Sequence, residues 1–306
     1  MRLPYILKLR LTERCNLKCK HCYLGHAKND LNVDKMIKIF EQEFLGKIGY
    51  VCLTGGEALL HKELKKIIDY LYSKKINYCI ASNGILLDEF LIEYFVEKKL
   101  NYIQISLEAP IREINDNIRG DGVYNVVIRN IKNAVKAGLR VVIGITINHQ
   151  NYMYINEMKE LAEALGADIR YEIFLPIGEG EKNEDVLKIR SNEMKIIIET
   201  LKKIESKKIR IIKPELLETG CGAGDIFATI NPDFTISPCD MLCEKYKSNI
   251  IEEGKTFKEV WEKDEKLNEW RRCMNIEKNF TGCKAASYVY TGRLDANDLL
   301  GEELMR

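Results

Sequence analysis

Three cysteines lie within eight residues near the start of the chain. Cys15, Cys19 and Cys22 are spaced C-x-x-x-C-x-x-C and directly follow the apolar segment Ile6–Leu11. Thiolates on one short loop can each bind one iron of a cubane 4Fe–4S cluster, and three thiolates leave the fourth iron open. An open metal position is where a substrate or cofactor binds. The alternative is a zinc knuckle completed by His21, but that ring lies between two of the cysteines, where it would struggle to reach the same metal.

A second motif follows the next apolar segment, Val51–Leu53. There the chain reads Gly55-Gly56-Glu57. Paired glycines let the backbone approach a ligand closely, and the carboxylate can accept a hydrogen bond from an ammonium group. Alone, this tripeptide is a common turn. Its place one segment after the cysteine loop makes it a candidate binding site.

The cysteine spacing and the Gly-Gly-Glu motif together resemble the radical S-adenosylmethionine (SAM) superfamily. The resemblance implies a 4Fe–4S cluster on the three cysteines whose open iron binds SAM. It also implies that Gly55, Gly56 and Glu57 bind the amino group of SAM. In that family an electron from the cluster cleaves SAM to a 5′-deoxyadenosyl radical, which abstracts hydrogen from the substrate. The cofactor carries this chemistry, and the protein supplies binding, orientation and exclusion of water.

The same resemblance implies further SAM contacts after later apolar segments. Asn83 lies in a Ser-Asn-Gly turn that lines the SAM pocket in the family. Ser106 begins a stretch that resembles the family's Ser-Leu-Asp-Gly, although Glu108 and Ala109 depart from it. Arg119, beside a glycine, could bind the SAM carboxylate or lie in a plain helix-entry loop. The implied contacts are Tyr23, Asn83, Ser106, Arg119 and Asn148.

Segments with strand-like and helix-like spacing alternate and must position these motifs. Six such units over roughly 175 residues predict an α/β fold with a parallel sheet and crossover helices. A closed eight-stranded barrel needs about 250 residues, so the units fit the open, partial (β/α)6 TIM-type barrel that the resemblance implies. The segments predicted as strands are Ile6–Leu11, Val51–Leu53, Asn77–Ala81, Tyr102–Leu107, Val141–Ile147 and Ile169–Phe174. The segments predicted as helices are Val33–Phe44, Leu64–Leu71, Glu89–Val96, Val126–Val135, Ile155–Leu165 and Asn192–Ile204.

The chain divides into three expected regions. Residues 1–190 form the partial barrel, residues 191–220 a linker helix and strand, and residues 221–306 a small, irregular, cysteine-rich extension. The order of cysteines in the last region resembles the SPASM and Twitch extensions, which hold auxiliary 4Fe–4S clusters. The resemblance implies one auxiliary cluster, with Cys243 or Cys273 as its fourth ligand or with that position open. Thiols that hold zinc or nothing are the alternative. The implied ligands are Cys221, Cys239, Cys283 and, as one option, Cys243.

Departures from the family pattern affect the remaining thiols. Asn279 and Gly301 stand where the pattern has cysteines, so we expect a second auxiliary cluster to be absent. A spare thiol, Cys243 or Cys273, could donate a hydrogen atom to a substrate radical, as the family's peptide epimerases require. Asp240 matches an acid that sulfatase-maturing relatives use as a base, although an exposed aspartate is the plainer interpretation.

Composition bounds the remaining choices. The chain has 306 residues, 47 Lys and Arg against 46 Asp and Glu, and a net charge of +1, which gives no sign of a nucleic-acid partner. No apolar run approaches the roughly 20 residues of a membrane span, and the N-terminus lacks a signal-peptide core. We therefore expect a cytoplasmic protein, in which ten cysteines favour metal binding over disulfides. Cys52 and Cys79 lie within apolar segments and are predicted to be small core residues.

The sequence thus predicts a radical SAM enzyme with one auxiliary cluster that modifies a ribosomally made peptide by epimerisation, oxidation or thioether formation. The alternatives are tailoring of a haem precursor or other small metabolite, and a non-catalytic iron–sulfur protein. Expected partners are the peptide and an electron donor such as ferredoxin or flavodoxin. Because the chain begins almost at the first strand, a separate leader-recognition protein is a further expected partner.

Overall fold

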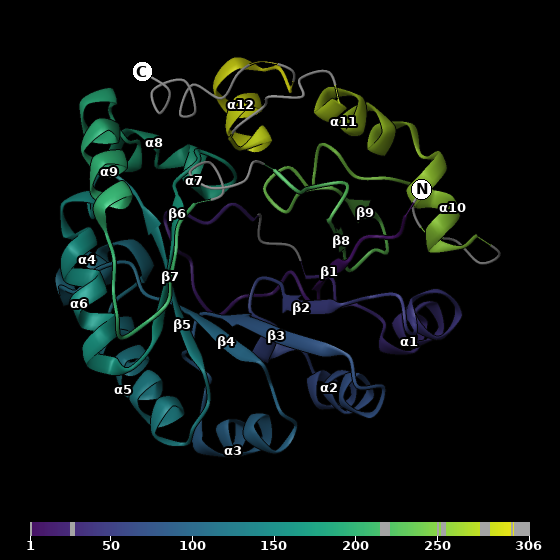
Figure 1. Cartoon of the computed structure of the whole chain (residues 1–306), viewed down its shortest axis with the longest axis horizontal. Helices are drawn as coiled ribbons and strands as arrows, with labels where there is room; N and C mark the ends of the chain where they lie inside the picture. The colour runs from purple at the N-terminus through teal and green to yellow at the C-terminus, as the bar shows by residue number, and fades with distance from the viewer. Residues whose placement is uncertain are drawn as a thin grey trace.

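A single open sheet, wrapped by helices, forms the centre of the molecule (Figure 1). The computed structural model describes residues 2–24, 28–214, 221–249, 251, 255–275, 282–294 and 296. Nine described strands lie in the order β7-β6-β5-β4-β3-β2-β1-β8-β9, and only β8 and β9 pair antiparallel. The strands are β1 (Ile6–Arg10), β2 (Tyr50–Thr54), β3 (Asn77–Ser82), β4 (Tyr102–Ser106), β5 (Val141–Ile147), β6 (Asp168–Ile173), β7 (Ile211–Ile212), β8 (Phe227–Ile230) and β9 (Ile236–Ser237).

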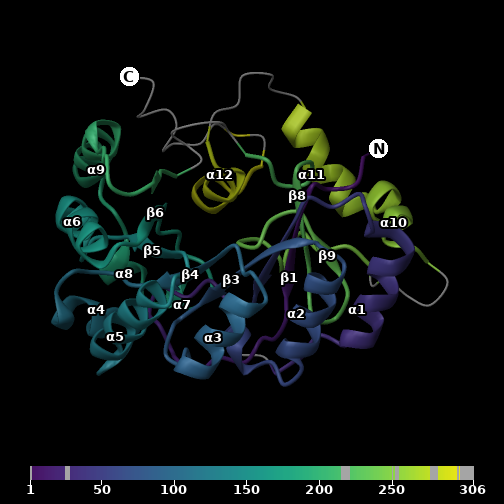
Figure 2. The same cartoon turned by 60° about the horizontal axis from the view of Figure 1, so that its bottom comes forward.

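Helices cover the outer side of the sheet, and C-terminal helices lie across the gap between its two edges (Figures 1 and 2). The helices of the barrel are α1 (Val33–Ile39), η1 (Phe40–Phe44), η2 (Ala58–Leu60), α2 (Leu64–Ser73), α3 (Glu89–Glu97), α4 (Arg112–Arg119), α5 (Val123–Lys136), η3 (Tyr152–Tyr154), α6 (Ile155–Leu165), α7 (Glu179–Lys182), α8 (Glu184–Leu187) and α9 (Ser191–Lys203). The C-terminal helices are α10 (Phe257–Lys263), α11 (Glu265–Asn275) and α12 (Lys284–Thr291).

Alternation along the strands separates two environments. Leu7 and Leu9 of β1 are fully buried in the hydrophobic core beneath the helices. Because successive side chains of a strand point to opposite faces, Lys8 and Arg10 lie on the inner face of the barrel. Apolar side chains thus hold the sheet to its helices, and polar ones remain available inside.

The prediction of six β/α units in an open parallel sheet is confirmed. All six predicted strands are present in the expected order as β1–β6. The predicted helix Val33–Phe44 changes to a π-helix at Phe40, and the charged segment predicted as a strand leads only to the two-residue β7. The helix α4 was not predicted. It is strongly polar, and so lacks a broad apolar stripe.

The C-terminal region is joined to the barrel at two places. The strand β8 pairs in parallel with β1, so the sheet continues from the barrel into the cysteine-rich region. The second place is the start of α10, where the Glu43 carboxylate accepts from the backbone N–H groups of Phe257 and Lys258 at 2.5 and 2.7 Å. The rings of Phe44 and Phe257 pack edge-on beside this contact, with centroids 4.8 Å apart. The π-helical turn thereby adds hydrogen-bond acceptors to the first turn of α10, whose N-cap is Thr256, and gives that helix a packing surface.

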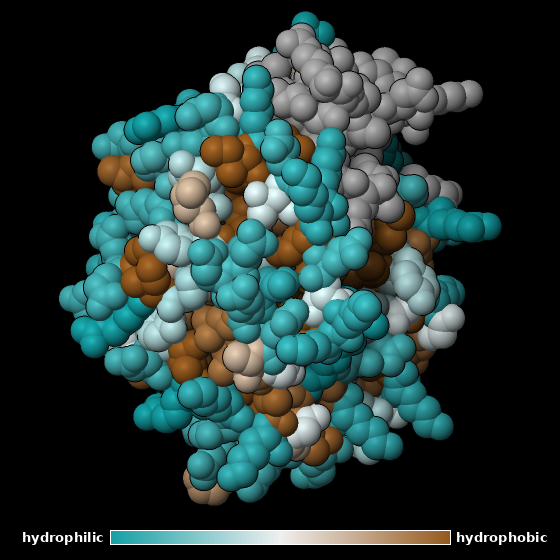
Figure 3. Space-filling model, turned by 60° about the vertical axis from the view of Figure 1, so that its left-hand side comes forward, coloured by the Kyte–Doolittle hydropathy of each residue, from teal (hydrophilic) through white to brown (hydrophobic). Residues whose placement is uncertain are grey.

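The outer surface offers few apolar features on the side that carries α4, α6 and α9. Figure 3 shows this face as mainly hydrophilic, with separate small apolar areas. Scattered apolar side chains of this kind are normal on a protein surface. In the described part of the chain, no helix has both the length and the apolar character that a bilayer crossing requires.

Candidate active site

The three N-terminal cysteines lie on the loop after β1. The end of β1 is hydrogen-bonded to β2, because Leu11 N donates to Thr54 O at 2.8 Å. Within the loop, Cys22 N donates to Cys19 O at 3.1 Å. Burial raises the pKa of Cys19 to about 11. The guanidinium of Arg119 acts in the opposite direction on Cys15, Cys19 and Cys22 alike. One cation therefore favours the thiolate form of all three ligand candidates.

The two glycines of the Gly-Gly-Glu motif pack directly on this loop. Gly56 N donates to Thr12 O at 2.7 Å. A Cβ on Gly55, whose φ is +155°, would lie 2.5 Å from Thr12 O, and one on Gly56 would lie 2.4 Å from Arg14 O. Side chains cannot fit at such distances, so both positions require glycine. The close approach expected of these glycines is thus made to the backbone of the cysteine loop.

Glu57 links the motif to the turn after β3. Its carboxylate is 1% exposed and accepts from Ser82 Oγ at 2.8 Å and Asn83 N at 2.6 Å. Burial raises its pKa, and these hydrogen bonds oppose the rise. The Asn83 side chain continues the network, because its Nδ2 donates to Asn16 Oδ1 at 2.7 Å and lies 3.8 Å from Cys15 Sγ. Glu57 and Asn83 thereby connect two predicted SAM-binding motifs to the cysteine loop.

A buried ion pair lies beside the same loop. Arg119 Nη1 donates to Glu108 Oε1 at 2.8 Å, and the two side chains are 4% and 1% exposed. The other carboxylate oxygen accepts from Thr146 N at 2.8 Å, and His21 Nε2 lies 3.5 Å from Glu108. Sequence reasoning set Glu108 aside as a departure from the family's aspartate. The residue type nevertheless indicated the same chemistry, because glutamate keeps the carboxylate of aspartate and adds one methylene.

The remaining predicted SAM contacts have different surroundings. Ser106 ends β4 and is half-buried. Asn148 is fully buried, where its Nδ2 donates to Thr146 O at 3.0 Å and its Oδ1 accepts from Gln150 N at 2.9 Å, so its amide holds the turn after β5. Burial raises the pKa of Tyr23, and the nearby guanidinium of Arg10 opposes this rise.

The C-terminal cysteines fall into two groups. Burial raises the pKa of the Cys239 thiol, and Cys283 and Cys221 are near enough to add to this rise through their charge. Cys243 is 3% exposed and stands apart, because its Sγ accepts from Arg10 Nη1 at 3.0 Å. Arg10 was not among the predicted site residues. Its contact with Cys243 spans 233 positions, which local sequence patterns do not encode.

Cys273 lies on α11, near Tyr246. Burial raises the pKa of Tyr246, and Cys273 adds to this rise. The neighbouring Trp270 fixes the loop of Cys221, because its Nε1 donates to Ala223 O at 2.9 Å. A Cβ on Gly224, whose φ is +81°, would lie 2.7 Å from the Trp270 ring. The predicted departures at residues 279 and 301 lie outside the described residues.

Asp240 is engaged by two partners. Its Oδ2 lies 2.6 Å from Lys8 Nζ, and its Oδ1 accepts from Thr229 Oγ1. Burial disfavours the charged form of Lys8, but the Asp240 carboxylate outweighs it and raises the pKa of Lys8. Both oxygens of Asp240 are therefore occupied inside the barrel.

The donor set of the cysteine loop fits an iron–sulfur cubane. Three thiols come from one loop, and the N–H group of Arg119 Nε is buried nearby without a partner among the described residues. A buried donor of this kind favours an anionic group beside it. Within the described ranges, no three His, Cys, Asp or Glu side chains are grouped closely enough to hold one metal ion. A cubane instead spreads its ligands over several irons.

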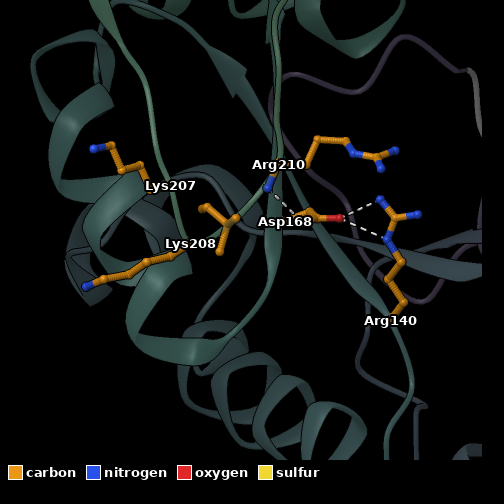
Figure 4. Close-up of a pocket in the computed structure, with 6 residues that line it drawn as sticks. Arg140, Asp168, Lys207, Lys208 and Arg210 are labelled. Atoms are coloured by element: carbon orange, nitrogen blue, oxygen red, sulfur yellow. Dashed lines mark hydrogen bonds and ion pairs between the residues drawn. The ribbon is translucent and has the colours of Figure 1, made fainter.

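A surface pocket of about 550 Å³ lies elsewhere, where β5 and β6 begin (Figure 4). Asp168 binds Arg140 there, with its Oδ2 2.6 Å from Nη2, and accepts from the backbone N–H of Arg210. Lys207 and Lys208 complete an exposed basic rim. None of the predicted site residues lines this pocket, so we place the candidate active site at the cysteine loop.

Comparisons with known proteins agree with this geometry. The family model of the Radical SAM superfamily matches residues 9–162. Mycofactocin maturase MftC of Mycolicibacterium smegmatis is 25% identical over 96% of this chain and 82% of its own. An AdoMet-dependent heme synthase of Methanosarcina barkeri is 25% identical over 98% of this chain and 95% of its own.

Among solved structures, Streptococcus suis SuiB bound to S-adenosylmethionine is similar with a TM-score of 0.76 at 18% identity, over 98% of this chain and 77% of that one. SuiB bound to the precursor peptide SuiA gives 0.75 at 17% identity, over 97% and 75%. At these identities the match shows the fold, which is the open partial barrel predicted from the sequence.

Proposed function

Because the chain belongs to the radical SAM superfamily, we propose that it is an enzyme that modifies a peptide with the aid of a 4Fe–4S cluster and SAM. Two similarities support a peptide: one relative is a maturase, and SuiB has been solved with a precursor peptide. When bound, cluster and SAM supply a 5′-deoxyadenosyl radical that abstracts hydrogen from a substrate carbon.

The cysteine loop and the residues packed on it form the proposed cofactor site. Cys15, Cys19 and Cys22 would hold the cluster, and Arg119 would balance its negative charge. The observation that carries this assignment is the packing of the Gly-Gly-Glu turn on the loop, with Gly56 N bound to Thr12 O at 2.7 Å. The residues that would bind SAM are Tyr23, Gly55, Gly56, Glu57, Asn83, Ser106, Arg119 and Asn148.

The C-terminal thiols would have two separate tasks. We assign one auxiliary iron–sulfur cluster to Cys221, Cys239 and Cys283, of which the first and last both influence the pKa of Cys239. Cys243 is then free to act as a hydrogen donor. Burial raises its pKa to about 11, so its sulfur keeps the hydrogen at neutral pH, as a donor must. Cys273, placed near Tyr246 instead, is the matched alternative.

This arrangement favours epimerisation among the peptide reactions. After one hydrogen has left a substrate carbon, the Cys243 thiol would return one to its other face. An electron from a donor such as ferredoxin or flavodoxin and a proton from solvent would restore the thiol. Asp240 remains a candidate base, but Lys8 must first move away from its carboxylate. A separate protein would recognise a leader peptide.

The direct test measures 5′-deoxyadenosine and solvent hydrogen uptake. The anaerobically reconstituted enzyme is given SAM, a reductant and candidate precursor peptides in deuterated water. We expect deoxyadenosine and one deuterium per modified residue, because thiol hydrogens exchange with solvent. Cys243→Ala should abolish deuterium uptake and still form deoxyadenosine, whereas Cys273→Ala should keep both. Absence of deoxyadenosine with every substrate would instead favour a non-catalytic iron–sulfur protein.

A second candidate function is the tailoring of a haem precursor, which the similarity to the heme synthase favours. Porphyrin substrates in the same assay separate the two functions. Iron content tests the auxiliary cluster: a Cys15/Cys19/Cys22→Ala protein should retain about four irons, and a protein without iron would overturn that assignment.

A further inference from the structure

Two cysteines that the sequence suggests as core residues face the inside of the barrel. Cys52 of β2 and Cys79 of β3 are register partners on neighbouring strands. Their chain neighbours Val51, Leu53 and Ile80 belong to the hydrophobic core under the helices. Because side chains alternate between the faces of a strand, Cys52 and Cys79 lie on the opposite, inner face.

The two thiols are close enough to interact directly. Neighbouring strands lie about 4.8 Å apart, which falls within the roughly 4.4–6.8 Å Cα separation of disulfide-bonded cysteines. The proximity of the two thiols is the first cause of the shift in each pKa, which is raised for Cys52 and lowered for Cys79. Both cysteines are free thiols in the structure. The register pairing therefore places two free thiols side by side on the inner face.

Side chains from three strands complete the surroundings of Cys79. The rings of Tyr50 and Tyr102 stack with centroids 6.3 Å apart. Burial opposes the thiolate of Cys79, but both tyrosines and the guanidinium of Arg170 lower its pKa. Arg170 Nε is itself buried without a partner among the described residues. Cys79 is 1% exposed and Cys52 is half-buried, so Cys52 is the thiol that an oxidant from solution reaches first.

We propose that Cys52 and Cys79 form an oxidisable dithiol, a modification site inside the barrel that closes to a disulfide with a small-molecule disulfide as oxidant. Cys52 Sγ, the more exposed of the two thiols, loses its proton to solvent, attacks one sulfur of oxidised glutathione and releases one glutathione thiolate. Cys79 Sγ, after losing its proton, attacks Cys52 Sγ and displaces the second glutathione. The two protein thiols are oxidised, and the glutathione disulfide is reduced to two thiols.

The new bond would join the two strands that carry the proposed SAM-binding turns. The strand β2 runs directly into Gly55, and β3 runs directly into Asn83. A covalent link between the middles of these strands therefore lies beneath both motifs. The reaction itself requires neither SAM nor substrate, so its test is independent of the proposed function.

Peptide mapping tests the proposal. The anaerobically reconstituted protein, with its clusters in place, is incubated with oxidised glutathione, blocked with N-ethylmaleimide while it is denatured, and digested with trypsin. The two cysteines fall in separate tryptic peptides, residues 48–62 and 76–98. We expect these peptides to appear linked and two hydrogens lighter than their sum, and dithiothreitol to separate them. Cys79→Ser should eliminate the link and leave Cys52 alkylated or bound to glutathione.

Two controls decide the outcome. Cys273→Ser lies outside the pair and should form the link as the unaltered protein does. Unfolding in urea before oxidation should reduce the link strongly, because proximity then no longer favours it. Full alkylation of Cys52 and Cys79 at oxidant levels that modify other thiols would overturn the proposal. A link that forms equally well in urea would overturn it too.

Discussion

Replacing Glu108 with glutamine should weaken the fold measurably. The carboxylate is 1% exposed and binds Arg119 Nη1 and Thr146 N, each at 2.8 Å. Breaking a buried ion pair from one side costs about 3–5 kcal/mol because the other charge stays uncompensated. Glutamine keeps an acceptor, so we expect a loss of about 2–3 kcal/mol, which is roughly a 30- to 150-fold change in the folding equilibrium.

Urea unfolding of the metal-free protein, followed by circular dichroism, measures this loss as a lower midpoint at unchanged slope. Glu113→Gln is the matched control: it lies exposed on α4, the helix that carries Arg119, and should change stability by less than about 0.5 kcal/mol. The double change Glu108→Gln with Arg119→Gln should cost less than the sum of the two, because no buried charge remains unpaired. Equal midpoints for Glu108→Gln and Glu113→Gln would refute the reasoning.

Three further perturbations test other parts of the structure. Gly56→Ala places a Cβ 2.4 Å from Arg14 O and should cost about 1–3 kcal/mol and reduce the iron bound by the N-terminal loop, read from absorbance; Gly46→Ala, whose added Cβ meets nothing within 4 Å, introduces no clash and should leave that iron unchanged. The metal-free protein should lose stability as the pH rises from about 8.5, because buried Cys19 and Cys243, with pKa values of about 11, keep their protons only when folded; Cys243→Ala should flatten this curve, and an unchanged curve would contradict the burial argument. Trp270→Ala should cost about 3–5 kcal/mol and lower auxiliary iron in the Cys15/Cys19/Cys22→Ala protein, whereas unchanged iron would show that the Trp270–Ala223 contact does not support that site.

The sequence allowed the barrel and its main motifs to be predicted because both are local. Each strand reads as a short apolar segment, and the cysteine spacing falls within eight residues. The contacts that join distant segments were not predictable in this way. Arg10 contacts Cys243 and Lys8 contacts Asp240 across 233 and 232 positions, and nothing in the local pattern of any of these residues specifies its partner.

A related limit affected residues whose role depends on neighbours. Cys52 and Cys79 sit in apolar segments, and only the pairing of β2 with β3 reveals that they meet on the inner face. The glycines at 55 and 56 were predicted to admit a ligand, whereas the contact seen in the structure is with the backbone of the cysteine loop. In both cases residue type indicated the chemistry, and tertiary contacts determined where it acts.

The pairing of β8 with β1 has a consequence for how the protein is made. On the ribosome β1 emerges first, but the strand that covers its outer edge, Phe227–Ile230, follows only after more than two hundred further residues. Until then β1 presents unpaired backbone groups, which invite association with other strands. A fragment that ends before β8 would keep this edge of β1 unpaired permanently. We therefore expect shortened chains to aggregate during expression. We also expect chaperones to bind the growing chain less once residue 230 has been synthesised.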